Sequence, residues 1–147
     1  MKYWTELRPD WKDAPMSYWV HRELDSAAWR DAHAFDPPSP RPIGRSGFVF
    51  LCVDVSRETL VFSSPQQLQT FISIMSAHPL PSSRRLSALR GTGAGPNSHW
   101  LSRLPAKLKS PKVRGQLVKG LSEISADLFQ RPNKLLKQRH AVKRRAA

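Results

Sequence analysis

The chain has little of what several protein classes require. It contains one cysteine, Cys52, which excludes an internal disulfide and a secreted scaffold held together by such bonds. The longest unbroken apolar run, from Phe48 to Val53, is far too short to cross a bilayer. The first ten residues carry charges and a proline where a secretory signal would be apolar. We therefore expect a cytoplasmic protein with no transmembrane segment.

Acidic residues are scarce in only one part of the chain. The formal net charge of the 147 residues is +13. Residues 1–79 hold eight Lys or Arg and nine Asp or Glu, a net of −1, whereas residues 80–147 hold sixteen and two, a net of +14. A positive excess confined to one region favours a polyanion as partner, which is a nucleic acid, a nucleotide or an anionic membrane surface. A basic surface that serves only solubility is the alternative.

Length and hydrophobic content predict one folded domain. With 147 residues, 39% of them hydrophobic, the chain has the usual size of a single domain. We expect this domain over residues 1–130, where residues 1–43 form an aromatic, helical extension with a proline-rich connector. Residues 131–147 form a basic tail that we expect to be disordered. The tail is a candidate binding segment for DNA or for the anionic cytoplasmic face of the inner membrane.

The N-terminal extension is rich in tryptophan. Ser17 and Ser26 are placed to cap two short helices within it. Acidic residues interleave with the aromatic ones, which disfavours nucleic acid as their ligand. We expect these rings to pack on the main domain or to meet a protein partner. The tryptophans concerned are Trp4, Trp11, Trp19 and Trp29, and the proline-rich run that follows from Asp36 to Pro42 predicts an extended connector.

The middle and the end of the chain carry the clearest secondary-structure patterns. Residues 47–53 and 59–62 are rich in β-branched and aromatic residues, and a polar turn separates them, so they predict a β-hairpin. Ser64, Pro65 and Gln67 form a capped helix start, and an apolar face then continues to Met75. A second helix is predicted from Ser110-Pro111, with an apolar stripe that reaches Leu128. Together these elements indicate an α/β (α+β) fold, a small mixed sheet with helices packed on it.

A glycine-spaced segment between arginines is the best candidate for a phosphate site. Glycines let a backbone approach a phosphate, and a helix start directly behind them offers N–H groups to an anion. Arginines on both sides could clamp phosphate oxygens. Asn97 or Ser98 is placed to cap that helix. His99, in its first turn, is the candidate acid or base, and Arg103, one turn further on, is the second candidate catalytic residue. The predicted nucleotide- or phosphate-binding residues are Arg84, Arg85, Arg90, Gly91, Gly93, Gly95, Asn97 and Ser98. A solvent-exposed loop followed by an ordinary helix cap explains the same pattern equally well.

Two further groups complete the candidate sites. Asp54 and Glu58 flank the predicted hairpin turn and are the candidate ligands of Mg²⁺, although plain turn residues explain them more simply. Basic residues on and before the last helix are the candidate contacts to DNA phosphates. These are Lys107, Lys109, Lys112, Arg114 and Lys119.

One family resembles this sequence. The residues that carry the resemblance are Gly47-Phe-Val-Phe-Leu, Phe62-Ser-Ser-Pro-Gln-Gln-Leu, Leu80-Pro-Ser-Ser-Arg-Arg-Leu-Ser and the run from Gly95 through Pro105 to Arg114. Over residues 45–122 the chain resembles the oncogenic suppression (Osa-type) fertility-inhibition proteins of conjugative plasmids. The resemblance implies a ParB/sulfiredoxin-like fold, ATP and DNA binding, ATPase and DNase activity, and a block of DNA transfer through a type IV secretion system. In the wider superfamily a Gly-x-His-Arg element binds phosphate; here Gly95 to His99 is the nearest match, and Arg103 is not adjacent to the histidine.

Two main hypotheses follow from the sequence, beside the alternative of an RNA-associated basic protein that stacks bases on its tryptophans. The first is a fertility-inhibition factor that binds ATP and DNA, with Mg²⁺ as cofactor, and hydrolyses phosphoanhydride or phosphodiester bonds. The second is a non-catalytic basic module that binds DNA or a partner in the secretion apparatus, such as its coupling protein or a substrate of it. The sparse carboxylates of the second half favour the second hypothesis, and the glycine and arginine segment favours the first.

Overall fold

The computed structural model describes residues 1–91 and 98–129, which divide into two compact units. Among the described residues, unit 1 comprises residues 1–68 and 125–129, and unit 2 comprises residues 69–91 and 98–124. The domain predicted over residues 1–130 comprises both units, and the predicted basic tail, 131–147, lies outside the described residues. None of the helices in the described part of the chain combines the length and the apolar character that a membrane span needs.

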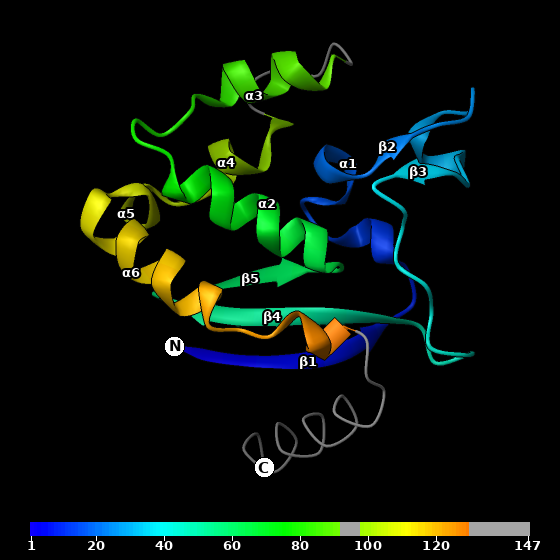
Figure 1. Cartoon of the computed structure of the whole chain (residues 1–147), viewed down its shortest axis with the longest axis horizontal. Coiled ribbons are helices and arrows are strands. Elements are labelled where there is room, and N and C mark those ends of the chain that lie inside the picture. The colour runs from blue at the N-terminus through cyan, green and yellow to red at the C-terminus, as the bar shows by residue number, and fades with distance from the viewer. Residues whose placement is uncertain (92–97, 130–147) are drawn as a thin grey trace. The chain divides into compact units, whose positions relative to one another are not determined.

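Unit 1 is built on a three-stranded antiparallel sheet (Figure 1). Strand β4 (Phe48–Val55) is central and pairs with β1 (Lys2–Arg8) on one side and with β5 (Glu58–Phe62) on the other. Residues 49–53 of β4 are all buried, because both faces of the central strand are covered. The predicted hairpin is therefore present, whereas β1 was not predicted. The presence of both helices and strands agrees with the expected α+β class, but the sheet is antiparallel and not mixed as predicted.

The turn between β4 and β5 is tighter than the sequence suggested. Only Ser56 and Arg57 lie between the two strands, with φ angles of 49° and 69°. Positive φ at both central residues is the geometry of a type I′ turn, which matches the twist of a hairpin. Asp54 and Glu58 therefore belong to the strand ends, where they pair with Thr59 and Val55.

Aromatic residues of the N-terminal segment form a cluster within unit 1. Trp11 is buried in the first 3-10 helix, η1 (Trp11–Asp13), and its ring lies edge-on to those of Trp29 and Phe35, at 5.9 and 5.1 Å. The expected packing of these rings is thus found for Trp11, while Trp4, Trp19 and Trp29 stay partly exposed. Of the two predicted helices, one is a single turn, α1 (Ser17–Val20), and the other a 3-10 turn, η2 (Trp29–Asp31). A two-stranded pair, β2 (Arg22–Glu23) with β3 (Phe35–Asp36), holds this region together.

A buried polar network fixes the start of helix α2 (Pro65–Ser76) within unit 1. The Gln67 amide donates to the hydroxyls of Ser17 and Ser63, at 3.1 and 2.8 Å, and accepts from the Ser63 N–H at 2.9 Å. Both hydroxyls donate to the Trp11 carbonyl, at 2.7 and 2.8 Å. The Gln67 N–H donates to Ser64 Oγ, so Ser64 caps the helix as predicted. The Gln67 side chain reaches back one residue beyond the cap, which differs slightly from an ordinary capping box.

Unit 2 is helical. Beyond the second part of α2 it contains α3 (Ser83–Arg90), α4 (Trp100–Arg103), α5 (Ala106–Lys109) and α6 (Pro111–Ser122), of which α3 and α5 were not predicted. Within this unit α3 contacts α4, and α5 contacts α6. The apolar stripe of the last predicted helix is buried at Leu117, Leu121 and Ile124. The helix itself ends at Ser122, and Leu128 belongs to a separate 3-10 turn, η4 (Ala126–Phe129), of unit 1.

Candidate phosphate- and DNA-binding site

The end of α3 provides the first part of the candidate phosphate site. The Ser82 hydroxyl caps the helix by accepting from the Arg85 N–H at 3.1 Å, and Gly91 ends it in the left-handed conformation with φ of 70°. A glycine suits this position because it has no Cβ to clash there. Arg84 and Arg85 are exposed, whereas Arg90 is buried. Two of the three predicted arginines are therefore open to a solvent-borne ligand, and the third lies in the interior.

His99 has a structural role in this fold. It is the N-cap of α4, where sequence analysis expected Asn97 or Ser98, and its Nδ1 accepts from the Leu101 N–H at 3.1 Å. The side chain is only 3% exposed. Burial lowers the pKa of His99 to about 4, so the ring is neutral near pH 7. Because capping uses the lone pair of Nδ1, this nitrogen cannot serve as a base in the structure described.

Of the other predicted residues near His99 in the sequence, two are described and both are exposed. Arg103, one turn further along α4, is exposed, as is Ser98. Gly93, Gly95 and Asn97 lie outside the described residues. The structure thus brings α3 and α4 together, with Arg84, Arg85 and Gly91 on the first helix and its end, and His99 and Arg103 on the second.

Two buried polar atoms on these helices have no hydrogen-bond partner among the residues that the structure describes. They are the Oγ of Ser87 in α3 and the Nε1 of Trp100 in α4, on side chains that are 5% and 6% exposed. The Trp100 ring packs against Phe71 of α2, with 5.0 Å between ring centroids. An unsatisfied buried donor costs about 1–3 kcal/mol, so groups of this kind mark places where a ligand oxygen would be favourable. Both residues lie on the helices that flank the predicted phosphate loop.

The basic residues predicted to contact DNA are concentrated on α5 and α6. Lys107, Lys112 and Lys119 are exposed, and Lys109 is half-buried. Arg114 differs: it is 6% exposed, and its guanidinium donates to Nδ1 of His78 at 3.1 Å. Arg114 therefore joins α6 to the segment after α2 and is not presented to solvent.

Asp54 and Glu58 belong to no cluster of metal-binding side chains among the residues that the structure describes. The Asp54 carboxylate accepts from the Thr59 hydroxyl at 2.8 Å across the hairpin. Over residues 1–91 and 98–129, no three His, Cys, Asp or Glu side chains cluster closely enough to hold a metal ion. Two carboxylates alone fall short of a protein-built site, although Mg²⁺ commonly completes its shell with water and phosphate oxygens.

A buried histidine and serine pair was missed by sequence reasoning. The Nδ1 of His21 lies 2.9 Å from the Pro37 carbonyl, and its Nε2 lies 2.8 Å from Ser64 Oγ. Since a carbonyl only accepts, Nδ1 carries the proton of the neutral ring and the Ser64 hydroxyl donates to Nε2. Burial lowers the pKa of His21, which favours this neutral form. Both side chains are at most 1% exposed, so the pair supports the start of α2 and the proline segment. No signal within the local sequence could have joined residues 21, 37 and 64.

A second unpredicted group lies on the sheet. Glu6 on β1 accepts from Arg8 at 2.6 Å and from the thiol of Cys52 at 3.1 Å. Burial, helped by the hydrogen bond to Glu6, raises the pKa of Cys52 to about 12, so the thiol stays protonated. The lone cysteine is therefore a packed, unreactive core residue.

Comparison with known proteins gave no match: no protein-family model, no curated protein and no solved structure is significantly similar to the chain.

Proposed function

We propose that this chain is a DNA-binding protein and that the exposed cations of unit 2 contact the phosphate backbone. Residues 69–124 contain nine Lys or Arg and a single acidic residue, Glu123, a formal net charge of +8. Residues 1–68 contain eight Lys or Arg and nine Asp or Glu, a net of −1. Sequence-independent binding to DNA is driven by the release of counterions from phosphates, which requires exposed cations of this kind. The single observation that carries the proposal is this concentration of charge in one helical unit.

The exposure of the side chains supports some of the proposed contacts and argues against others. Lys107, Lys112 and Lys119 support the proposal because they are exposed on α5 and α6. Arg114 is left out of the interface, since it is buried against His78. Contacts of lysine to phosphates position a protein on DNA without reading its sequence, so we propose binding with little base preference.

The test is a salt titration of binding to a fluorescent duplex of about 20 base pairs. Replacing Lys107, Lys112 and Lys119 with Gln removes up to three phosphate contacts, which lowers the slope of log affinity against log salt by about 2–3 for duplex DNA. The matched control is the triple change Lys2→Gln, Arg45→Gln and Arg57→Gln in unit 1, where all three side chains are exposed. Equal slopes for the two triple variants would refute the assignment of the interface to unit 2.

The cellular role that we propose rests on the resemblance to the fertility-inhibition proteins, together with their ParB/sulfiredoxin-like fold. In this role the chain blocks DNA transfer through a type IV secretion system by binding DNA or a component of that system. Expression of the protein in a donor should lower the transfer frequency of a mobilisable plasmid. The triple Lys→Gln variant of unit 2 should restore transfer if DNA binding is the cause. Unchanged transfer with the unaltered protein would remove this role while leaving DNA binding in place.

Binding of ATP with Mg²⁺, followed by hydrolysis of ATP or DNA, is the second function that we propose. The observation in its favour is the pair of unsatisfied donors, Ser87 Oγ and Trp100 Nε1, on the helices that carry Arg84, Arg85 and Arg103. His99 is a poor candidate for the acid or base, because its side chain is buried, its Nδ1 lone pair accepts the capping bond, and its lowered pKa leaves it no proton to donate near pH 7. Incubation of DNA with the protein, Mg²⁺ and ATP tests the activity, with Arg103→Gln and Arg84→Gln as variants. Product that is unaffected by both changes, or no product at all, would reject a catalytic site here.

A further inference from the structure

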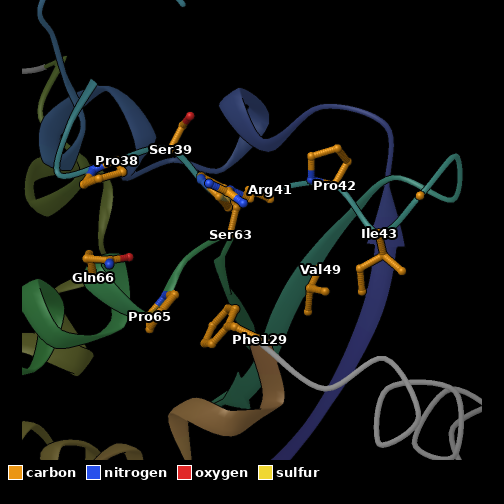
Figure 2. A pocket seen from close by; sticks show the side chains of 12 residues that line it. Pro38, Ser39, Arg41, Pro42, Ile43, Val49, Ser63, Pro65, Gln66 and Phe129 are labelled. Carbon is orange, nitrogen blue, oxygen red and sulfur yellow. The ribbon is translucent and has the colours of Figure 1, made fainter. Parts of the chain in front are cut away.

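Unit 1 carries a proline-rich ridge with a hollow on each side. The ridge is the segment Pro38–Pro42, and its residues line both hollows. Each hollow has a volume of about 570 Å³, which lies within the range of ligand-binding pockets. In Figure 2 the segment from Pro38 to Ile43 runs along one side of the first hollow, opposite Pro65, Gln66 and Phe129.

The ridge is held rigidly at both ends. At its start, His21 Nδ1 donates to the carbonyl of Pro37 at 2.9 Å. At its end, the Ile43 N–H donates to the Gly47 carbonyl at 2.8 Å, and Gly47 packs so closely on β1 that an added Cβ would lie 2.6 Å from the Arg8 carbonyl oxygen. The prolines of the ridge also fix their own φ angles. A ligand that binds here therefore loses little free energy in ordering the protein.

The first hollow combines one cation with an apolar wall. Arg41 is exposed and makes no hydrogen bond or ion pair with any other described residue. Among the described residues that line this hollow, it is the single charged one. Val49, Ile43 and Phe129 supply apolar surface around it (Figure 2). A guanidinium beside apolar walls suits a carboxylate that is carried on an apolar chain.

The second hollow, which Arg41 also lines, adds a second cation, Lys12. Lys12 Nζ lies 5.9, 5.6 and 5.3 Å from the ring centroids of Trp11, Trp29 and Phe35. It donates to the carbonyls of Arg30 and Ala32, at 2.7 and 3.2 Å, which leaves one of its three N–H groups for a ligand. Leu24, which also lines this hollow, is 66% exposed and is among the most exposed large apolar side chains that the structure describes.

Acidic residues are absent from the described lining of both hollows, although unit 1 as a whole contains nine of them in residues 1–68. We propose that the ridge and its two hollows form a docking surface for an acidic segment of a partner protein, in which carboxylates meet Arg41 and Lys12 and apolar side chains enter the hollows. A peptide fits better than a small molecule, since Pro38, Arg41 and Pro42 are exposed and two hollows share one ridge. Complementary charge sets the choice of partner, and the apolar contacts add affinity.

The test measures binding of a synthetic peptide to the full chain by fluorescence anisotropy. The probe is a fluorescein-labelled ten-residue peptide that alternates Glu with Phe or Leu, and its twin carries Gln in place of every Glu. We expect the Glu peptide to bind at least tenfold more tightly than the twin. Arg41→Gln should weaken the Glu peptide at least fivefold, and Leu24→Ser at least threefold.

Matched controls separate docking at the ridge from simple attraction to the basic unit 2. Arg45→Gln removes a nearby exposed charge that lines neither hollow, and Lys109→Gln removes a half-buried charge from unit 2. Leu89→Ser is the partner control for Leu24, because the two leucines are 67% and 66% exposed. Each control should change the affinity by less than twofold. Equal losses for Arg41→Gln and Lys109→Gln, or equal affinities of the two peptides, would overturn the proposal.

Discussion

The assignment of His99 as a buried, neutral cap can be tested through the pH dependence of stability. The folded-state pKa is about 4, whereas the ordinary value of the unfolded chain is 6.5. As the pH falls below 6.5, His99 binds a proton in the unfolded state but stays unprotonated in the folded state. The free energy of unfolding therefore decreases until the pH reaches about 4. Between pH 7.5 and pH 5 this difference in pKa corresponds to a loss of about 2 kcal/mol from His99 alone.

The informative variant is His99→Asn, measured by urea denaturation at pH 7.5, 6 and 5. Asparagine keeps an N-cap acceptor for the Leu101 N–H but does not titrate in this range. The variant should therefore lose about 2 kcal/mol less than the unaltered protein between pH 7.5 and pH 5. His21, whose pKa is also lowered by burial, contributes equally to both proteins and cancels in the comparison.

A companion variant, His99→Ala, separates the cap from the titration. It removes both the acceptor and the buried ring, so we expect a loss of about 3 kcal/mol at pH 7.5, of which about 1 kcal/mol belongs to the cap. Identical pH dependence in His99→Asn and the unaltered protein would refute the buried, neutral state. A loss below about 0.5 kcal/mol in His99→Ala would refute the capping role.

Three further predictions concern the framework of the fold, and each is measured by thermal or urea unfolding. Gly47→Ala should lower the free energy of unfolding by about 3 kcal/mol, because φ is +104° there and the new Cβ would lie 2.6 Å from a carbonyl oxygen of β1. The control Gly115→Ala, in open space on α6, should raise the free energy of unfolding by about 0.5–1 kcal/mol. Similar results for the two variants would contradict this reasoning. Gln67→Leu should lower the free energy of unfolding by about 3 kcal/mol, because the buried polar groups that now bond to the Gln67 amide would lose their hydrogen-bond partner. An unchanged stability would show that the network is dispensable. Ser56→Asn with Arg57→Gly should stabilise the protein by about 1 kcal/mol, because both positions have positive φ, and a loss of stability would argue against the type I′ turn.

Local patterns in the sequence were enough for several elements. The cap at Ser64 with Pro65 behind it places the start of α2, and the cap works through atoms only three residues apart. The apolar, β-branched run before Val55 and the short run after it specify the hairpin, because adjacent strands need few residues between them. The proline at position 111 likewise marks the start of α6. In each case the deciding interaction falls within a window of a few residues.

The candidate site depended on the same kind of signal and was only partly predictable. The concentration of positive charge is a property of the sequence, whereas the exposure of Lys107, Lys112 and Lys119 is observed in the structure. The sequence does not show which cations are buried, because Arg114 is buried by its contact with His78, a residue 36 positions earlier. The cap of α4 was predicted at Asn97 or Ser98, because asparagine and serine are common N-cap residues, whereas the structure has it at His99.

Tertiary structure alone decided the rest. Strand β1 has no clear alternating pattern, yet it pairs with β4 along seven residues that are about 40 or more positions away. The same long-range pairing brings Glu6 to Cys52, and the fold of unit 1 brings His21 to Ser64 across 43 positions. These contacts form because burial compensates the entropy of closing long loops, a balance that no short segment contains. The sequence by itself therefore determined the charge and the local elements, and the packing determined which charged and polar groups are left to meet a ligand.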